Sequence, residues 1–198
     1  MSRGKVAVMD DRPHLTVKQY VEHEAHTPFK HEYIDGMVVA MGGGTIEHAR
    51  LPIALAIQLG NQLVGSPCVV YSADLRIRIL ACDLITYPDL SIICGEPEMD
   101  TEDPYAQLNP TVLVEVTSPS SETYDRGAKY TCYQQIPSLC EYVIVSQREH
   151  AVDVFRRGDD GTWSLEQRGE AGDAVALTSI GCTIDVGALF RDPRVKTS

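Results

Sequence analysis

Apolar residues in the first part of the chain recur at the spacing of an amphipathic helix. Leu15, Tyr20 and Val21 stand among charged residues and predict a short helix between His14 and His26, with Thr16 as its N-cap. A second helix is predicted from the glycines before Thr45 to about Val64, because Ile46, Ala49, Ile53, Ile57 and Leu63 fall near helical spacing.

Two residue types qualify that second helix. Pro52 lies inside it, where proline removes a backbone hydrogen bond and costs about 3 kcal/mol, so we expect a kink or a delayed start. The glycines Gly42-Gly43-Gly44 do not match the G-x-x-x-x-G-K-[ST] phosphate loop, and a plain turn is favoured over a phosphate cradle.

Short apolar runs with the period of strands make up most of the remaining pattern. Between His31 and Met41 two such runs flank Asp35-Gly36, a dipeptide typical of tight hairpin turns because glycine accepts a positive φ. Leu75–Ile79 alternates aliphatic and arginine positions, which predicts a strand with the arginines on one face. Further strands are predicted at Tyr87–Cys94, Thr111–Thr117, Tyr142–Ser146, Val152–Arg157, Thr162–Gln167 and around Thr183.

A helix of about a dozen residues is predicted from Thr123 or Tyr124 towards Gln135, between two of these strands. A strand–helix–strand unit of this length predicts a right-handed crossover between parallel neighbours. We therefore expect an α/β fold with a mixed central sheet of about five strands, helices on both faces and an added hairpin.

The chain has 198 residues, of which 43% are hydrophobic, and this size suits one domain. We place that domain at residues 14–190, after a polar N-terminal arm (1–13) and before a C-terminal tail (191–198). No apolar run approaches the roughly 18 residues of a membrane helix, and no signal peptide is recognisable. These features predict a cytoplasmic protein.

The six cysteines include no C-x-x-C pair, and most lie in apolar runs. We expect them to be reduced and to act as small buried hydrophobic residues rather than as zinc ligands or disulfides. Three histidines, His23, His26 and His31, have no evident partner cluster, so we expect no metal site there.

Two acidic residues interrupt apolar strands. Asp89 precedes Leu90, Ile92 and Ile93, and Glu115 is the single charge in Thr111–Thr117. A buried carboxylate without a partner is costly, and the simplest alternative is an ion pair with a nearby arginine or lysine. Two acids on neighbouring buried strands repel each other unless one is protonated or a cation lies between them. Oxygen ligands of this kind suit Mg²⁺.

The order and spacing of several segments resemble the Uma-type putative restriction endonucleases, a family of the PD-(D/E)XK nuclease superfamily. Pro88-Asp89 and Glu115-Val116-Thr117 resemble the two halves of the superfamily signature. The matching segments are Glu32-Tyr33-Ile34-Asp35-Gly36, Glu47-His48, Tyr71-Ser72-Ala73-Asp74-Leu75-Arg76-Ile77, Tyr87-Pro88-Asp89-Leu90-Ser91, Glu115-Val116-Thr117-Ser118-Pro119-Ser120, Asp125-Arg126-Gly127-Ala128-Lys129-Tyr130, Ile136-Pro137-Ser138-Leu139, Glu141-Tyr142-Val143 and Ser179-Ile180-Gly181-Cys182. The resemblance implies a metal-dependent DNA endonuclease, with Asp89 and Glu115 as the ligands of Mg²⁺ or Mn²⁺.

The third signature position departs from the superfamily pattern, because Thr117 stands where a lysine is usual. The resemblance implies that Lys129, on the following helix, replaces it, as in some branches of the superfamily. Arg126, Lys129 and Tyr133 share a helical face by spacing. The alternative is a solvated Lys129 paired with Asp125.

Glu32 matches the acid that superfamily members place ahead of the sheet, where it supports the metal shell. Asp35 is better explained by the hairpin turn, and Asp74 and His48 are weaker candidates. Arg76 and Arg78 face either phosphate or solvent, and solvent is slightly favoured.

The net charge of −11 does not favour DNA as a partner, because DNA binding normally relies on Lys and Arg. Two other functions therefore stay open, a non-catalytic nuclease-like assembly protein and a metal hydrolase of small phosphoesters. A homodimer is possible, as for other nucleases that cut both strands.

Overall fold

The computed structural model describes residues 14–192 and residue 194. The predicted arm at 1–13 lies outside the described residues, as do residues 193 and 195–198 of the predicted tail.

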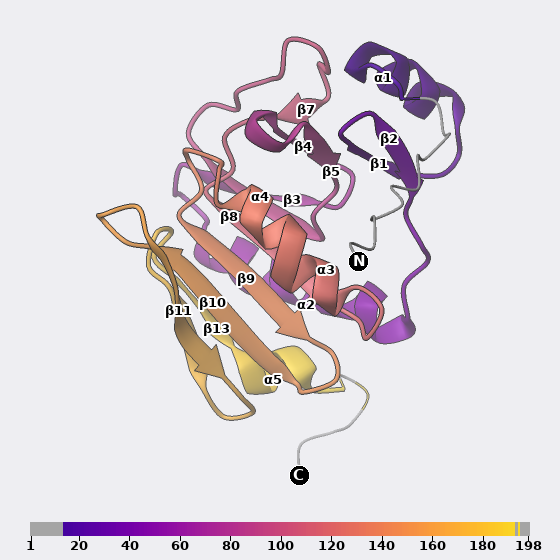
Figure 1. Cartoon of the computed structure of the whole chain (residues 1–198). Coiled ribbons are helices and arrows are strands. Elements are labelled where there is room, and N and C mark those ends of the chain that lie inside the picture. Colours follow the sequence, from indigo (N-terminus) through magenta and orange to yellow (C-terminus); the bar gives the residue numbers. More distant parts are fainter. Residues whose placement is uncertain (1–13, 193, 195–198) are drawn as a thin grey trace, which may run out of the picture.

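A six-stranded mixed sheet forms the centre of the molecule (Figure 1). In order across the sheet its strands are β11 (Trp163–Gly169), β10 (Ala151–Arg157), β9 (Glu141–Ser146), β8 (Val112–Thr117), β6 (Leu90–Cys94) and β3 (Cys68–Ser72). Only β8 and β9 pair in parallel, which confirms the predicted crossover; the other neighbours are antiparallel.

A second sheet of five strands lies beside the first. It contains β2 (Met37–Ala40), β1 (His31–Ile34), β5 (Leu84–Thr86), β4 (Arg76–Ile79) and β7 (Ala106–Gln107), in that order. A third, two-stranded sheet joins β12 (Ala174–Leu177) to β13 (Cys182–Asp185). The six-stranded central sheet agrees with the predicted mixed sheet of about five strands, and the added hairpin β10–β11 forms one edge of it.

Helices cover both faces of the central sheet, as predicted. Val112, Val114 and Val116 of β8 pack with the buried leucines of α2 (Ile46–Gln62), whereas Leu113 packs on the other face with Tyr133. The remaining helical segments are α1 (Val17–His26), η1 (Leu80–Cys82), α3 (Glu122–Tyr124), the π-helical turn η2 (Asp125–Lys129), α4 (Tyr130–Tyr133) and α5 (Val186–Phe190). Among the helices described, none has the length and apolar character that crossing a bilayer requires.

The N-cap residues predicted for the first two helices are confirmed. Thr16 accepts a hydrogen bond from the Gln19 N–H in a capping box, and Thr45 caps α2 by accepting from the His48 N–H. Since α2 begins at Ile46 and contains Pro52, the expected delayed start is wrong.

The arginines of β4 do not face solvent. Arg78 is 5% exposed and lies 2.5 Å from an Asp83 oxygen, and Arg76 lies 2.7 Å from Asp103, which is fully buried. The alternation within β4 was read correctly, but acids from elsewhere in the chain cover the arginine face. The slight preference for solvent is therefore wrong.

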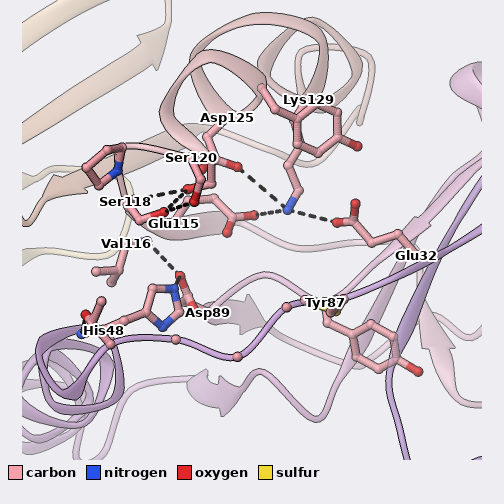
Figure 2. A pocket seen from close by; sticks show the side chains of 18 of the residues that line it. Glu32, His48, Tyr87, Asp89, Glu115, Val116, Ser118, Ser120, Asp125 and Lys129 are labelled. Atoms are coloured by element: carbon pink, nitrogen blue, oxygen red, sulfur yellow. Dashed lines mark hydrogen bonds and ion pairs between the residues drawn. The ribbon is translucent and has the colours of Figure 1, made fainter.

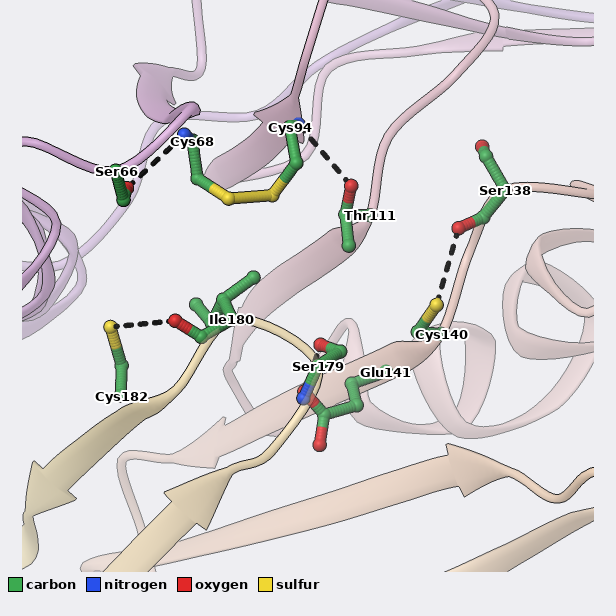
Figure 3. Close-up of a disulfide and its surroundings, with 10 residues drawn as sticks. All are labelled: Ser66, Cys68, Cys94, Thr111, Ser138, Cys140, Glu141, Ser179, Ile180 and Cys182. Carbon is green, nitrogen blue, oxygen red and sulfur yellow. Dashed lines mark hydrogen bonds between the residues drawn. A yellow bond between two sulfur atoms is a disulfide. The ribbon is translucent and has the colours of Figure 1, made fainter.

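Four of the six cysteines form disulfides, Cys68–Cys94 and Cys82–Cys132, which contradicts the expectation of reduced thiols. The register of β3 with β6 sets Cys68 directly opposite Cys94, with their Cα atoms 3.9 Å apart (Figure 3). Cys140 is an exposed free thiol, and Cys182 alone is free and buried. Disulfides are rare in the cytosol, so these bonds oppose the cytoplasmic expectation.

Candidate active site

A cleft of about 550 Å³ opens where the two larger sheets meet. Its walls come from β1, the end of β2, the glycine loop and first turn of α2, the segment just before β6, the end of β8 and the helical segment that follows β8. All four residues proposed from the sequence line this cleft: Glu32, Asp89, Glu115 and Lys129 (Figure 2).

The pairing of β6 with β8 explains why the two strand acids meet. Leu90 lies opposite Val114 in this antiparallel pair, so continuing the register by one residue sets Asp89 opposite Glu115. Side chains directly opposite on antiparallel strands share a face, with Cβ atoms about 4.5–5.5 Å apart. Asp89 Oδ2 also accepts a hydrogen bond of 2.7 Å from the Val116 N–H, which fixes the carboxylate against β8.

Lys129 lies between the carboxylates of two sheets. Its Nζ is 2.8 Å from Glu115 Oε1, 3.0 Å from Glu32 Oε1 and 4.0 Å from Asp125 Oδ1. Its side chain is only 5% exposed, so the alternative of a solvated lysine is wrong. The ion pair considered for Glu115 is present, and its partner is Lys129.

Two hydroxyl groups hold the acids of this cluster. The Tyr133 hydroxyl donates to Glu115 Oε1 at 2.7 Å, from one helical turn beyond Lys129. The Thr86 hydroxyl donates to Glu32 Oε1. Thr86 was not recognised from sequence, although it directly precedes the Tyr87-Pro88-Asp89 segment; Tyr133 was recognised only as sharing a helix face with Lys129.

Burial dominates the protonation of the strand acids. It raises the pKa of Glu115 to about 8; Lys129 acts against this rise, and the charges of Asp89 and Asp125 add to it. Burial also raises the pKa of Asp89, while His48, the Val116 N–H and Lys129 act in the opposite direction. The charge of Asp89 thus disfavours the ionisation of Glu115.

Lys129 stays charged in this setting. Burial alone would lower the pKa of its ammonium group, but the carboxylates of Glu115, Glu32 and Asp125 raise it above its ordinary value. The cleft therefore keeps one buried cation beside Glu115, whose ionisation burial disfavours.

His48 lies beside Asp89, with Nε2 3.5 Å from Oδ2. The sequence offered it as a weaker candidate or as a first-turn helix residue, and it is both in the first turn and next to the site. Gly44 makes room for this ring, because a Cβ at that position would lie 2.7 Å from His48 Nδ1. The three glycines line the cleft as an irregular loop, in keeping with the preferred turn.

Other residues named from the sequence lie away from the acids. Arg126 shares the helix with Lys129 but turns to Asp153 on β10, 2.6 Å away. Asp74 is exposed and pairs with Lys30, and Asp35 occupies the hairpin turn with φ 46°. The face expected for Arg126, Lys129 and Tyr133 therefore delivers only two of its three residues to Glu115.

The donor set of the cleft fits a hard divalent cation. Two carboxylates opposite each other offer oxygen ligands, and because burial raises the pKa of both, a cation between them would stabilise their charged forms. Asp89 and Glu115 are the residues that would hold it.

A family model and two proteins of known sequence are similar to this chain. The family model Uma2, described as "Putative restriction endonuclease", matches residues 17–187. Two proteins of Synechocystis sp. (strain ATCC 27184 / PCC 6803 / Kazusa), both named as uncharacterized, are 36% (slr1290) and 28% (sll1609) identical to this chain. These alignments cover 90% of this chain and 93% of slr1290, and 77% of this chain and 86% of sll1609.

A solved structure supports the fold. The crystal structure of a protein from Anabaena variabilis ATCC 29413, described as a putative nuclease belonging to DUF820, has a TM-score of 0.65 and 16% identity with this chain. The superposition covers 86% of this chain and 96% of that one. The predicted restriction-endonuclease-like α/β fold is thus confirmed. Since the family model extends from the start of α1 into α5, the chain belongs to the Uma2 family of putative restriction endonucleases.

Proposed function

We propose that this chain is a Mg²⁺- or Mn²⁺-dependent endonuclease that hydrolyses DNA phosphodiester bonds in the cleft described above. The observation that carries the proposal is the buried Lys129 ammonium 2.8 Å from Glu115, a strand acid that the β6–β8 register sets opposite Asp89. Membership of the restriction endonuclease family supports the same reaction class.

Asp89 and Glu115 would bind the metal, which in such sites activates a water and neutralises charge on a phosphoryl oxygen. The Val116 N–H and the Tyr133 hydroxyl hold these two carboxylates in place through the hydrogen bonds described above. Lys129 brings a fixed positive charge to the same point, where it would stabilise the charge that develops on the phosphate. Glu32 orients Lys129 from the opposite sheet.

Metal binding and cleavage test the proposal together. Calorimetric titration should show that the wild type binds Mg²⁺ or Mn²⁺, and that Asp89→Asn, which removes a ligand charge, loses both affinity and nicking of plasmid DNA at low salt. Asp74→Asn is the matched control, because Asp74 is an exposed acid paired with Lys30. A wild-type protein that binds neither ion and nicks nothing would favour the non-catalytic assembly role.

One observation favours the small-phosphoester alternative. Among the described residues that line the cleft, Lys129 is the only lysine or arginine, so this part of the chain offers few cations to a long phosphate backbone. Competition separates the two substrates. If duplex DNA inhibits hydrolysis of a chromogenic phosphodiester more strongly than mononucleotides do, the DNA proposal stands; the reverse order favours a small phosphoester.

A further inference from the structure

We infer that His23, Glu24 and His31 form a second metal site, outside the cleft, that binds Zn²⁺. One ligand atom from each of these residues lies within 4.8 Å of the other two. His23 and Glu24 are neighbours near the end of α1, and His31 is the first residue of β1. This differs from the expectation of no metal site at His23 and His31, which was based on their spacing alone, because folding brings Glu24 and the two histidines together.

Glu24 is held in position as a ligand. Its side chain is 3% exposed, and its two oxygens have separate partners: Oε1 lies 2.6 Å from His31 Nδ1, and Oε2 accepts a hydrogen bond of 2.8 Å from the Tyr87 hydroxyl. The His31 ring is itself mostly buried, at 14% exposed. Two of the three groups are thus already ordered and in contact.

His23 is the most exposed of the three proposed ligands. Its residue is exposed, and its ring meets the His31 ring edge-on, with centroids 4.9 Å apart. Zinc–nitrogen bonds of about 2.0–2.1 Å in a tetrahedron set the ligand atoms roughly 3.3 Å apart. Zinc binding therefore requires the exposed His23 side chain to turn and the 2.6 Å contact between Glu24 Oε1 and His31 Nδ1 to widen.

The ligand chemistry selects the ion. Two imidazoles and one carboxylate are a known zinc set, whereas Mg²⁺ prefers oxygen ligands throughout. A bound Zn²⁺ would take the place of the proton that Glu24 and His31 share, and Tyr87 would remain as the outer partner that orients the carboxylate. The fourth position is left to water.

The site has a structural consequence for the cleft. His31 immediately precedes Glu32 on β1, and consecutive strand side chains point to opposite faces. Tyr87, which holds Glu24, stands two residues before Asp89. Zinc would thus fasten α1 to β1 behind the segments that carry two of the cleft acids, and it would stabilise the folded state by mass action.

Zinc counting on the tag-free protein tests the inference. With excess Mg²⁺ present to occupy the cleft, equilibrium dialysis and elemental analysis should give one Zn²⁺ per chain. His23→Ala and His31→Gln should each weaken zinc binding by at least about tenfold, since even the loss of an outer-shell partner costs 10–100-fold. His26→Ala is the matched control on the same helix and should bind zinc as the wild type does.

A second variant separates this site from the cleft. The double substitution Asp89→Asn, Glu115→Gln should leave zinc binding unchanged, whether or not the protein cleaves DNA. The inference is overturned if the wild type takes up no zinc, if His23→Ala and His31→Gln bind it at wild-type affinity, or if the cleft variant loses it. Because no step uses DNA, failure of the nuclease proposal would leave these results unaffected.

Discussion

Lys129 is the residue on which the cleft's electrostatics depend, since it is buried and its ammonium lies within 4.0 Å of three carboxylates. A buried charge among acids is stable only because the partners compensate each other. Lys129 therefore contributes both to the stability of the cleft and to the proposed chemistry, and the two contributions can be measured separately.

Replacing Lys129 with alanine should lower the cleavage rate by about 10²–10³, the usual cost of losing one electrostatic donor to the transition state, while metal binding is retained. Single-turnover nicking and calorimetry measure the two effects. Lys18→Ala, at an exposed lysine of α1, should change neither. Loss of metal binding in Lys129→Ala together with its activity would contradict the separate role given to the lysine.

Glu115 should make the stability of the metal-free protein depend on pH. Between the ordinary pKa of a glutamate and about 8, folded Glu115 keeps a proton that the unfolded chain has released. The folded state then binds more protons than the unfolded state, so the free energy of unfolding falls as pH rises through this window.

Mg²⁺ competes with that proton, so the rise in Tm on adding Mg²⁺ should be larger above pH 8 than below it. Thermal unfolding with chelator or with Mg²⁺, on either side of this pH, measures the difference. Glu115→Gln should reduce both the pH dependence and the Mg²⁺ effect. A larger Mg²⁺ effect at the acidic side would count against Glu115 as a ligand.

At the scale of elements, periodic patterns correctly predicted those features that depend only on the residues of one strand or helix. The alternation in β8 correctly separated the valine face from the face of Leu113 and Glu115. The patterns did not predict contacts in which the partner of a side chain comes from a distant segment of the chain. Asp103 covers Arg76, and Cys132 finds Cys82 across a separation of 50 residues; neither spacing marks the pair in the sequence.

The Cys82–Cys132 bond ties the short helix η1 to the short helix α4. Closing a loop of this length is worth about 4 kcal/mol in the chain-entropy model, so Cys82→Ser with Cys132→Ser should lower the free energy of unfolding by up to that amount. Urea unfolding measures it, with Cys140→Ser, at the exposed free thiol, as the control. Alkylation of the unreduced, unfolded wild type should label two cysteines; six would mean that neither bond forms.

Across the whole molecule, the arginines are largely paired with acids. A carboxylate lies within ion-pair distance of Arg50, Arg76, Arg78, Arg126, Arg148, Arg156 and Arg168. Together with the net charge of −11, this leaves few unpaired arginines in the described part of the chain for the release of DNA counterions.

DNA affinity should consequently depend only weakly on salt. With about two phosphates neutralised, a plot of log K against log salt concentration should have a slope near −2. Fluorescence anisotropy of a labelled duplex, with Ca²⁺ in place of Mg²⁺ to prevent cleavage, measures the slope. A value near −6 would require a basic surface that the described residues do not present.

Much of the candidate site followed from sequence because its residues break local rules: Asp89 and Glu115 interrupt apolar strands, and Thr117 stands where a lysine is expected. From the sequence, His48 was named only as a weaker candidate and Thr86 was not recognised, because a first-turn histidine and a strand threonine break no rule. Their positions depend on how the two sheets meet.

The contact between the two larger sheets affects how the molecule partially unfolds. Glu32 belongs to the five-stranded sheet, Glu115 to the six-stranded sheet, and one ammonium group binds both. Separating the sheets would leave buried charges without a counterion, so partial unfolding of either sheet alone is disfavoured. In native-state hydrogen exchange, amides of β1 and β8 should open together with one free energy, and in Lys129→Ala they should divide into two independently exchanging groups.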